Sequence, residues 1–321
     1  MKFGLTLPNR GVLFGAITPD EMLAMSEIAD QSGRFEHLWV GDSFLAKPRM
    51  ESITLMAGLA ARTKRLRIGP ACMASFPLRD PLLLAYQWAS LDLLSNGRTI
   101  LVACTGIVPQ AGAAVEDAQY GVDNKARAER LVEWIVLLKR LWTEEKVTVE
   151  GRHYRVHGVT IEPRPAAKPR PPIWIANNSL AARSVVERTH RRVAEHADGW
   201  MTALSNPEEV SWRLQDIRSK VRELGRNPDT FPTCLYHNIN VNEDRGAALA
   251  ESKKFLDTYY TTDMPPDRVA SWTAAGSPQE CVEHLRVYER IGMGSIGLRC
   301  TSWDQRGQLR RVIEEVLPHL S

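Results

Sequence analysis

Residues 80–104 read Asp80-Pro-Leu-Leu-Leu-Ala-Tyr-Gln-Trp-Ala-Ser-Leu-Asp-Leu-Leu-Ser-Asn-Gly-Arg-Thr-Ile-Leu-Val-Ala-Cys104. Aspartate followed by proline is a typical helix start, so the stretch predicts a helix over Leu82 to Leu94. Ser95-Asn96-Gly97 ends this helix, because asparagine and glycine tolerate the left-handed conformation found after helices. The apolar run Thr99–Cys104 follows directly. A helix joined by such a short loop to a buried strand is typical of a parallel α/β fold.

Seven more apolar runs occur along the chain, and helical segments separate them. Strands buried on both faces have continuous apolar runs, and strands that alternate with helices pair in parallel through right-handed crossovers. The seven runs are Phe3–Leu7, His37–Gly41, Leu66–Met73, Ile173–Ala176, Gly199–Ala203, Thr233–Val241 and Ser295–Cys300. With Thr99–Cys104 they predict a (β/α)8 TIM barrel, formed by a single domain over residues 1–321, with its chemistry at the C-terminal ends of the strands.

Three further helix starts share one pattern. Thr18–Glu21, Asn206–Glu209 and Ser277–Glu280 each have a capping side chain first, proline second and glutamate fourth. This order predicts a capping box, in which the glutamate carboxylate reaches back to the N–H of the capping residue.

Two segments exceed what a minimal barrel needs. The first, Ile107 to about Asp123, is rich in glycine and alanine and is predicted as a loop and a candidate lid. The second, Val147–Pro172, begins with two alternating runs around Glu150-Gly151 that predict a small hairpin. It ends in a proline-rich stretch that we interpret as a stiff connector, the alternative being a polyproline ligand for a partner domain.

Charge and composition argue against several classes of protein. The 321 residues include 41 basic and 38 acidic ones, a net charge of +3 that is too balanced to predict binding to nucleic acid or a membrane. The densest basic stretch, Arg188–Arg192, is interpreted as the outer face of a helix. No apolar stretch approaches the roughly 20 residues of a membrane span, and no signal peptide precedes the first run. A soluble cytoplasmic protein is therefore expected.

Several catalytic and metal motifs are missing from the chain. Five cysteines are an odd number without CxxC spacing, so neither a disulfide framework nor a structural zinc site is predicted. The eight histidines do not combine with acidic residues at metal-ligand spacing, so no metal site is predicted. The sequence has no P-loop, HExxH or GxSxG motif.

Mostly small, sulfur-containing and amide side chains follow the predicted strands, together with a few charged ones. In order, the strand ends are Leu7-Pro8-Asn9, Gly41-Asp42-Ser43-Phe44, Cys72-Met73-Ala74, Cys104-Thr105-Gly106, Asn177-Asn178-Ser179, Thr202, Asn238 with Asn240, and Arg299. Such a rim, with few acids and bases, suits a large planar cofactor that performs the chemistry itself in a dry cavity.

In order and spacing, these segments resemble the bacterial luciferase-like monooxygenase superfamily, whose members use reduced FMN or the deazaflavin F420. The resemblance covers nearly the whole chain. The matching segments are Leu66–Gly69 through Arg79–Pro81, Ala89–Arg98 running into Ala103–Gly106, Trp39–Asp42, Pro171–Ala176, His196–Trp200, and Gly276–Glu280 leading to Gly292–Gly294. The resemblance implies a luciferase-like TIM barrel with short insertions after strand 4 and before strand 5.

The resemblance also implies where the cofactor ring binds. The isoalloxazine ring is expected over the ends of the third and fourth strands, against Ala71, Cys72, Met73, Cys104 and Thr105. A non-proline cis peptide often lies under the ring in this family, and Ala71-Cys72 is the position expected here. Cys104 matches a family position beside the ring carbon that binds oxygen, the alternative being a buried cysteine that acts as a small hydrophobic residue.

The cofactor phosphate is bound in family members by the loop after the fifth strand. Here that loop is Asn177-Asn178-Ser179, before a helix expected to start near Leu180. A helix N-terminus favours an anion, and Asn178 or Ser179 fits the role of helix cap equally well. Thr105 stands where some relatives have a basic phosphate contact.

Asp42 matches an acidic position common in the family. In many F420-dependent members the next residue is a catalytic histidine, whereas here it is Ser43. Asp42 and Ser43 are catalytic candidates together with Cys104, and the alternative for Asp42 is to cap the following loop.

The resemblance gives a first expectation of activity: a two-component monooxygenase in which reduced FMN and O2 oxygenate a small organic substrate. A separate NAD(P)H-dependent flavin reductase would supply the FMN. One alternative is an F420-dependent oxidoreductase that transfers hydride; the acidic arm of F420 would suit a rim formed by Arg79, Lys47 and Arg49. A second alternative is a non-catalytic flavin-binding barrel. A homodimer or homotetramer is expected, with no nucleic-acid or membrane partner.

Overall fold

A computed structural model describes residues 1–106, 111–178 and 181–320. Every predicted apolar run contains a strand, which confirms the barrel. The strands are β1 (Lys2–Leu7), β2 (His37–Val40), β3 (Arg67–Pro70), β4 (Leu101–Ala103), β7 (Ile173–Ala176), β8 (Gly199–Thr202), β9 (Thr233–Val241) and β11 (Ser295–Cys300). They pair in parallel in the order β3-β2-β1-β11-β9-β8-β7-β4. Bridges from Ile68 to Thr99 and from Met73 to Ala103 join β3 to β4 and nearly close the ring.

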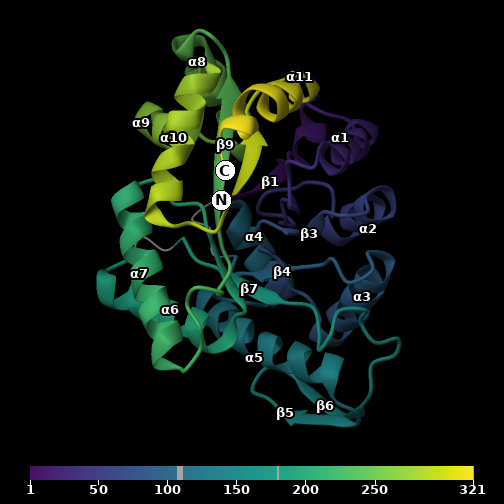
Figure 1. Ribbon diagram of the computed structural model, residues 1–321. Helices are drawn as coiled ribbons and strands as arrows, with labels where there is room; N and C mark the ends of the chain where they lie inside the picture. Colours follow the sequence, from purple (N-terminus) through teal and green to yellow (C-terminus); the bar gives the residue numbers. More distant parts are fainter. Residues whose placement is uncertain (107–110, 179–180, 321) are drawn as a thin grey trace.

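Helices cover the outside of the strands (Figure 1). They are α1 (Pro19–Ser32), α2 (Ser52–Arg62), α3 (Pro81–Leu94), α4 (Ala111–Tyr120), α5 (Asn124–Thr143), α6 (Arg183–His196), α7 (Pro207–Glu223), α8 (Arg245–Tyr260), α9 (Pro266–Ser271), α10 (Pro278–Ile291) and α11 (Gln305–Arg311). The start of α3 is as predicted, because the Asp80 carboxylate accepts the Leu83 N–H at 2.8 Å. In the described ranges, no helix combines the length and apolar character that crossing a bilayer requires.

Two of the three predicted capping boxes form. In α1 and α10 the capping residues Thr18 and Ser277 exchange hydrogen bonds with the glutamate three positions later. The third is wrong in one respect: Asn206 caps α7, but the Glu209 carboxylate binds Arg213 at 2.7 Å instead of reaching back. The charged Arg213 guanidinium, one turn along the helix, is a stronger hydrogen-bond donor to that carboxylate than the backbone N–H of Asn206.

The predicted loop after the fourth strand is partly wrong. Residues 107–110 lie outside the described part of the chain, but Ala111–Tyr120 is helix α4. Alanine-rich sequence favours a helix. Two acidic side chains of α4 also bind the buried Arg127 of α5, Glu116 at 3.0 Å and Asp117 at 2.7 Å. This pairing holds α4 against the barrel.

The predicted hairpin is confirmed. It consists of β5 (Val147–Glu150) and β6 (Arg155–Val159), which pair antiparallel beside α5. A further strand, β10 (Thr273–Gly276), was not predicted and pairs with β9 outside the ring. Its sequence Thr-Ala-Ala-Gly lacks the β-branched and aromatic residues that indicate a strand, so only its pairing with β9 defines it.

Tryptophan side chains fill the barrel interior and leave the site open at one end. Trp39 and Trp174 are buried, with ring centroids 5.8 Å apart. Glycines on neighbouring strands make room for them, because a Cβ at Gly4 would lie 2.6 Å from Trp39 Nε1 and one at Gly199 would lie 2.6 Å from Trp174 Nε1. This interior cluster forms the floor beneath the strand ends.

Candidate active site

Two neighbouring cavities lie at the C-terminal ends of the strands. The first, which we call the mouth cavity, has a volume of about 360 Å³. The second, which we call the side cavity, has a volume of about 510 Å³. Both are lined by Cys72, Ala74, Gly106 and Asn178, so these residues mark the junction between the cavities. The site therefore has room for a cofactor in one compartment and a substrate in the other.

The peptide bond between Ala71 and Cys72 is cis, as the resemblance implied. It lies at the end of β3, where Ala71 N–H donates to the Val40 carbonyl at 2.8 Å. Ala71 lines the mouth cavity and Cys72 lines both cavities. Met73, expected against the ring, is fully buried in the core and lines neither cavity.

Cys72 and Cys104 form a disulfide, with Cα atoms 6.2 Å apart. We predicted no disulfide framework and did not foresee this single bond, which also means that Cys104 has no free thiol. The sequence could not show the pairing, because the two cysteines are 32 residues apart and meet only because β3 and β4 end side by side. Cys234, Cys281 and Cys300 are free and buried.

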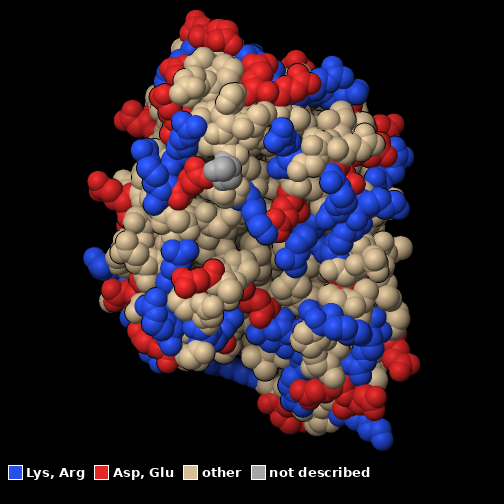
Figure 2. All heavy atoms as spheres, viewed as in Figure 1, with Lys and Arg blue, Asp and Glu red and all other residues tan. Residues whose placement is uncertain are grey.

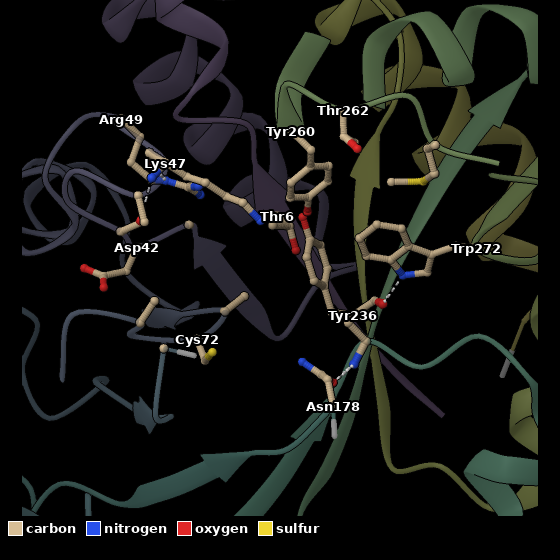
Figure 3. A pocket seen from close by; sticks show the side chains of 18 of the residues that line it. Thr6, Asp42, Lys47, Arg49, Cys72, Asn178, Tyr236, Tyr260, Thr262 and Trp272 are labelled. Atoms are coloured by element: carbon tan, nitrogen blue, oxygen red, sulfur yellow. Dashed lines mark hydrogen bonds between the residues drawn. The ribbon is translucent and has the colours of Figure 1, made fainter. Parts of the chain in front are cut away.

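The Asp42 carboxylate has a full set of partners. It accepts hydrogen bonds from Ser52 Oγ and the Ser75 N–H, both at 2.7 Å, and from Arg79 Nη2 at 3.2 Å. Arg79 also binds Glu51 at 2.6 Å. In Figure 3 the carboxylate points away from the centre of the mouth cavity. Arg79 is thus neutralised, and our suggestion that it serves an acidic arm is wrong.

Ser43 organises the turn that brings Lys47 into the mouth cavity. Its Oγ accepts the Lys47 N–H at 3.0 Å, and both residues line the cavity. The Lys47 ammonium then lies 4.9 Å from the centroid of the Tyr260 ring. A catalytic role for Asp42 or Ser43 stays a prediction.

The expected phosphate loop lines the side cavity in part. Asn177 and Asn178 both line it, and Thr105 lines it from the end of β4, whereas Ser179 lies outside the described residues. The helix start was placed too early: α6 begins at Arg183, and its capping residue Ala182 has no side chain that can cap. Asn178 instead accepts the Ala203 N–H at 2.6 Å.

The sequence did not indicate Arg192 as a site residue. We interpreted Arg188–Arg192 as an outer helix face, but Arg192 and Thr189 turn toward the side cavity and line it. Burial lowers the pKa of Arg192. A half-buried cation beside amide and hydroxyl groups is a suitable place for a phosphate.

A buried arginine surrounded by aromatic rings lies next to the mouth cavity. Arg299 is completely buried and donates to Asn238 Oδ1 at 2.9 and 3.1 Å and to the Tyr260 hydroxyl at 3.1 Å. Its guanidinium also lies over four rings, those of Tyr236, Tyr259, Tyr260 and Trp272. Tyr236, Tyr260 and Trp272 line the cavity, and sequence reasoning missed all three. Tyr260 ends a helix and Trp272 precedes the unpredicted β10, so neither follows a predicted strand.

Cations without acidic partners line the mouth cavity. They are Lys47, Arg49 and Arg268, and none pairs with a carboxylate among the described residues. Burial lowers the pKa of Lys47, and so do the neighbouring arginines. Elsewhere on the molecule, acidic and basic side chains are interspersed over the face shown in Figure 2.

The chain is a nearly closed (β/α)8 barrel in which two cavities meet over a non-proline cis peptide at the strand ends, the architecture that the family resemblance implied. Residues 1–295 match the family model described as luciferase-like monooxygenase. The chain belongs to the luciferase-like monooxygenase family.

Its relatives in this family use two cofactors. An F420-dependent glucose-6-phosphate dehydrogenase of Intrasporangium calvum is 27% identical over 319 residues, covering 94% of this chain and 95% of that protein. An FMNH2-dependent dimethylsulfone monooxygenase of Pseudomonas putida is 27% identical over 231 residues, covering 71% of this chain and 60% of that protein. Among solved structures, the monooxygenase RslO1 from Streptomyces bottropensis shares the fold, with a TM-score of 0.82, 24% identity and full coverage of both chains.

Proposed function

We propose that this chain is an F420-dependent oxidoreductase that transfers a hydride between the cofactor and a small organic substrate. The observation that carries the proposal is the set of cations at the mouth cavity, Lys47, Arg49 and Arg268, which no acidic side chain of the described chain neutralises. F420 differs from FMN by an extended acidic arm, which the two arginines of this set would bind. The F420-dependent relative that matches this chain over nearly its full length supports the same cofactor.

The side cavity fits the body of such a cofactor. Its wall is largely apolar, formed by Leu131, Ile175, Ala176 and the Cys72–Cys104 disulfide, and would exclude water from a planar ring. Arg192, Thr189 and Asn177 line the same cavity and would hold the phosphate from which the acidic arm continues. When bound, the deazaflavin supplies a two-electron hydride acceptor, and the junction between the cavities would bring substrate to it.

Oxygenation with reduced FMN was our first expectation, and it is now the second candidate function. The relative that uses FMNH2 covers 71% of this chain, whereas the F420-dependent one covers 94%. The disulfide also removes the free thiol at Cys104 on which that expectation partly rested. O2 and a separate flavin reductase belong to this second candidate only.

Titration of the purified protein with each cofactor tests the proposal. F420, oxidised FMN and anaerobically reduced FMN are added separately, and binding is followed by cofactor fluorescence or absorbance. We expect F420 to bind at least tenfold more tightly than either form of FMN. Tighter binding of reduced FMN, with a peroxyflavin absorbance band on admission of O2, would establish the monooxygenase instead, and binding of flavin with no turnover would favour the non-catalytic barrel.

A charge variant makes the test specific for the acidic arm. Arg49→Met is expected to weaken F420 binding about tenfold, or about 1.4 kcal/mol. The same variant should bind a deazaflavin that lacks the glutamate arm as tightly as the wild type does. Arg155→Met, at an exposed arginine on β6, is the matched control and should leave F420 affinity unchanged. Equal weakening for both cofactors would contradict the placement of the arm.

A further inference from the structure

The hydroxyl of Tyr260 lies at the centre of the mouth cavity. Tyr260 is the last residue of α8, and the left-handed Thr261 that follows ends the helix there. Figure 3 shows its ring reaching toward the Thr6 hydroxyl and the end of the Lys47 side chain, which come from β1 and from the loop after β2. Three polar groups from distant parts of the chain therefore converge on one point of the cavity.

Cations surround the Tyr260 oxygen. Arg299 Nη1 donates to it at 3.1 Å, and the Lys47 ammonium lies 4.9 Å from the ring centroid. The neighbouring Tyr236 hydroxyl also lowers the pKa of Tyr260. Burial alone would raise the pKa of Tyr260, but Arg299 and Lys47 lower it below its ordinary value. All these contacts favour a negatively charged phenol oxygen.

The acidic residues that line the cavity are not available for proton transfer. Asp42 accepts three hydrogen bonds, as described above. Glu116 accepts one from Arg127 at 3.0 Å and one from the Ala46 N–H at 3.1 Å. No histidine is among the described residues that line the mouth cavity. Among the residues that line the mouth cavity, Tyr260 is thus the candidate for proton transfer, because its contacts stabilise the deprotonated phenol oxygen.

The Thr6 hydroxyl points to a ligand at the same place. Thr6 is 2% exposed and lines the mouth cavity, and its Oγ1 has no hydrogen-bond partner among the described residues. A buried hydroxyl without a partner costs free energy, and an oxygen atom of a bound substrate would satisfy it. The structure thus offers one acceptor and one donor to the same substrate oxygen.

We propose that Tyr260 is the general acid–base group of this site, and that the substrate is an alcohol–carbonyl pair whose oxygen lies between Tyr260 and Thr6. This inference rests on the proposed hydride transfer. In the oxidative direction the substrate O–H bond breaks and its proton passes to the Tyr260 oxygen. The C–H bond breaks with its electron pair, which leaves as hydride to oxidised F420, and the carbonyl forms. Lys47 and Arg299 act as positioning residues that stabilise the phenolate before the proton arrives.

Tyrosine ionisation in the cofactor-free protein gives the first test, because it does not require turnover. Ultraviolet difference absorbance at the phenolate band is followed against pH for the wild type, Tyr260→Phe and Tyr259→Phe. In the wild type and in Tyr259→Phe we expect one tyrosine to ionise at a pH below the ordinary range for tyrosine. This low-pH transition should be missing in Tyr260→Phe. Lys47→Met should raise the pH at which it titrates. Ordinary titration of every tyrosine in the wild type would overturn the proposal.

Turnover gives the second test. With F420 and a panel of small primary and secondary alcohols as probes, Tyr260→Phe should lower kcat by about 10²- to 10⁴-fold, with the affinity for F420 unchanged. The acidic limb of the wild-type kcat–pH profile should follow the phenol titration. Retention of more than about a tenth of kcat in Tyr260→Phe would overturn the acid–base role. Failure of F420 to bind would overturn the proposed function and the alcohol substrate with it, whereas F420 binding without an acidic phenol would overturn only the role of Tyr260.

Discussion

Arg299 lies against the ring of Tyr260, with its guanidinium carbon 5.1 Å from the ring centroid and Nη1 3.1 Å from the phenol oxygen. A fully buried arginine normally needs a carboxylate, because removing its charge from water is costly. Here the described contacts are ring faces, an amide oxygen and a phenol. Cation–π contacts of this kind are strong when water is excluded. Arg299 therefore connects two properties: it holds the end of β11 in place, and it donates to the Tyr260 oxygen and so favours the ionised phenol.

Arg299→Lys is expected to disturb both properties. Lysine lacks the planar group that stacks on the rings and cannot make the paired bonds to Asn238, so we expect a loss of about 2–4 kcal/mol in the free energy of unfolding. The pKa of Tyr260 should rise, because the donor to its oxygen is lost. Chemical unfolding and the phenolate titration measure the two effects. Unchanged phenol titration would show that Arg299 does not act on Tyr260.

Asp42→Ala distinguishes a structural role from a catalytic one. The substitution leaves the 9%-exposed Arg79 side chain without its buried partner, so a loss of about 3–5 kcal/mol in unfolding free energy is expected. Glu51→Ala is the comparison: Glu51 binds the same arginine and is 37% exposed, but it also caps α2 by accepting the Thr54 N–H, so its loss should cost about 1–2 kcal/mol. Urea unfolding measures both. Full stability of Asp42→Ala combined with lost activity would instead make Asp42 a catalytic residue.

Gly106→Ala should damage the junction between the cavities. Gly106 has φ +66° and a Cβ there would collide with the Ala74 carbonyl oxygen. Gly121 has a similar φ of +58° with nothing within 4 Å, so Gly121→Ala shows the backbone cost alone, about 1–2 kcal/mol. We expect Gly106→Ala to cost more than about 3 kcal/mol and to weaken cofactor binding. Thermal unfolding and cofactor titration compare the two, and equal losses would contradict the collision.

The Cys72–Cys104 disulfide predicts how many cysteines of the denatured protein react with a thiol reagent before and after reduction. The denatured, unreduced protein should react with a thiol reagent at three cysteines, Cys234, Cys281 and Cys300, and at five after reduction. Closing a loop of this length stabilises a fold by about 3–4 kcal/mol, so reductant should lower the free energy of unfolding of the wild type. Cys104→Ala should be insensitive to reductant. Five reactive thiols before reduction would show that the bond is absent.

Buried histidines make the fold sensitive to mild acid. Burial lowers the pKa of His37 and of His284 to about 4, so both stay neutral in the folded state while the unfolded chain takes up protons near pH 6.5. The free energy of unfolding is therefore unaffected by these groups above pH 6.5 and decreases as the pH falls from 6.5 toward 4, by roughly 3 kcal/mol for each group. Urea unfolding at several pH values measures this slope.

His37→Phe isolates one of these contributions. Phenylalanine keeps an aromatic ring beside Trp39, whose centroid lies 5.1 Å from that of His37, but it cannot take up a proton. The slope between pH 6.5 and 4 should therefore flatten. A substitution at the exposed His157 is the control and should leave the slope unchanged. An unaltered slope in His37→Phe would remove that residue as a source of the acid sensitivity.

The sequence by itself determined the barrel, because its signals are local. Each apolar run and each capping pattern, such as Asp80-Pro81 before α3, depends on neighbours within a few residues, and the order of these patterns defines the alternation of strands and helices. The hairpin at 147–159 follows from the same kind of pattern. The family resemblance added the cis peptide at Ala71-Cys72, which local patterns do not indicate.

Tertiary structure alone decided which side chains meet at the site. Thr6, Lys47 and Tyr260 converge although more than 200 residues separate the first from the last, and Tyr260 comes from a helix end that no strand pattern indicates. The Cys72–Cys104 disulfide and the position of Arg192 in the wall of the side cavity also depend on contacts between distant parts of the chain. Periodicity along the chain predicts which face of an element is buried. Contacts between elements distant in sequence depend on how the closed ring of strands places their ends, and no local pattern contains that information.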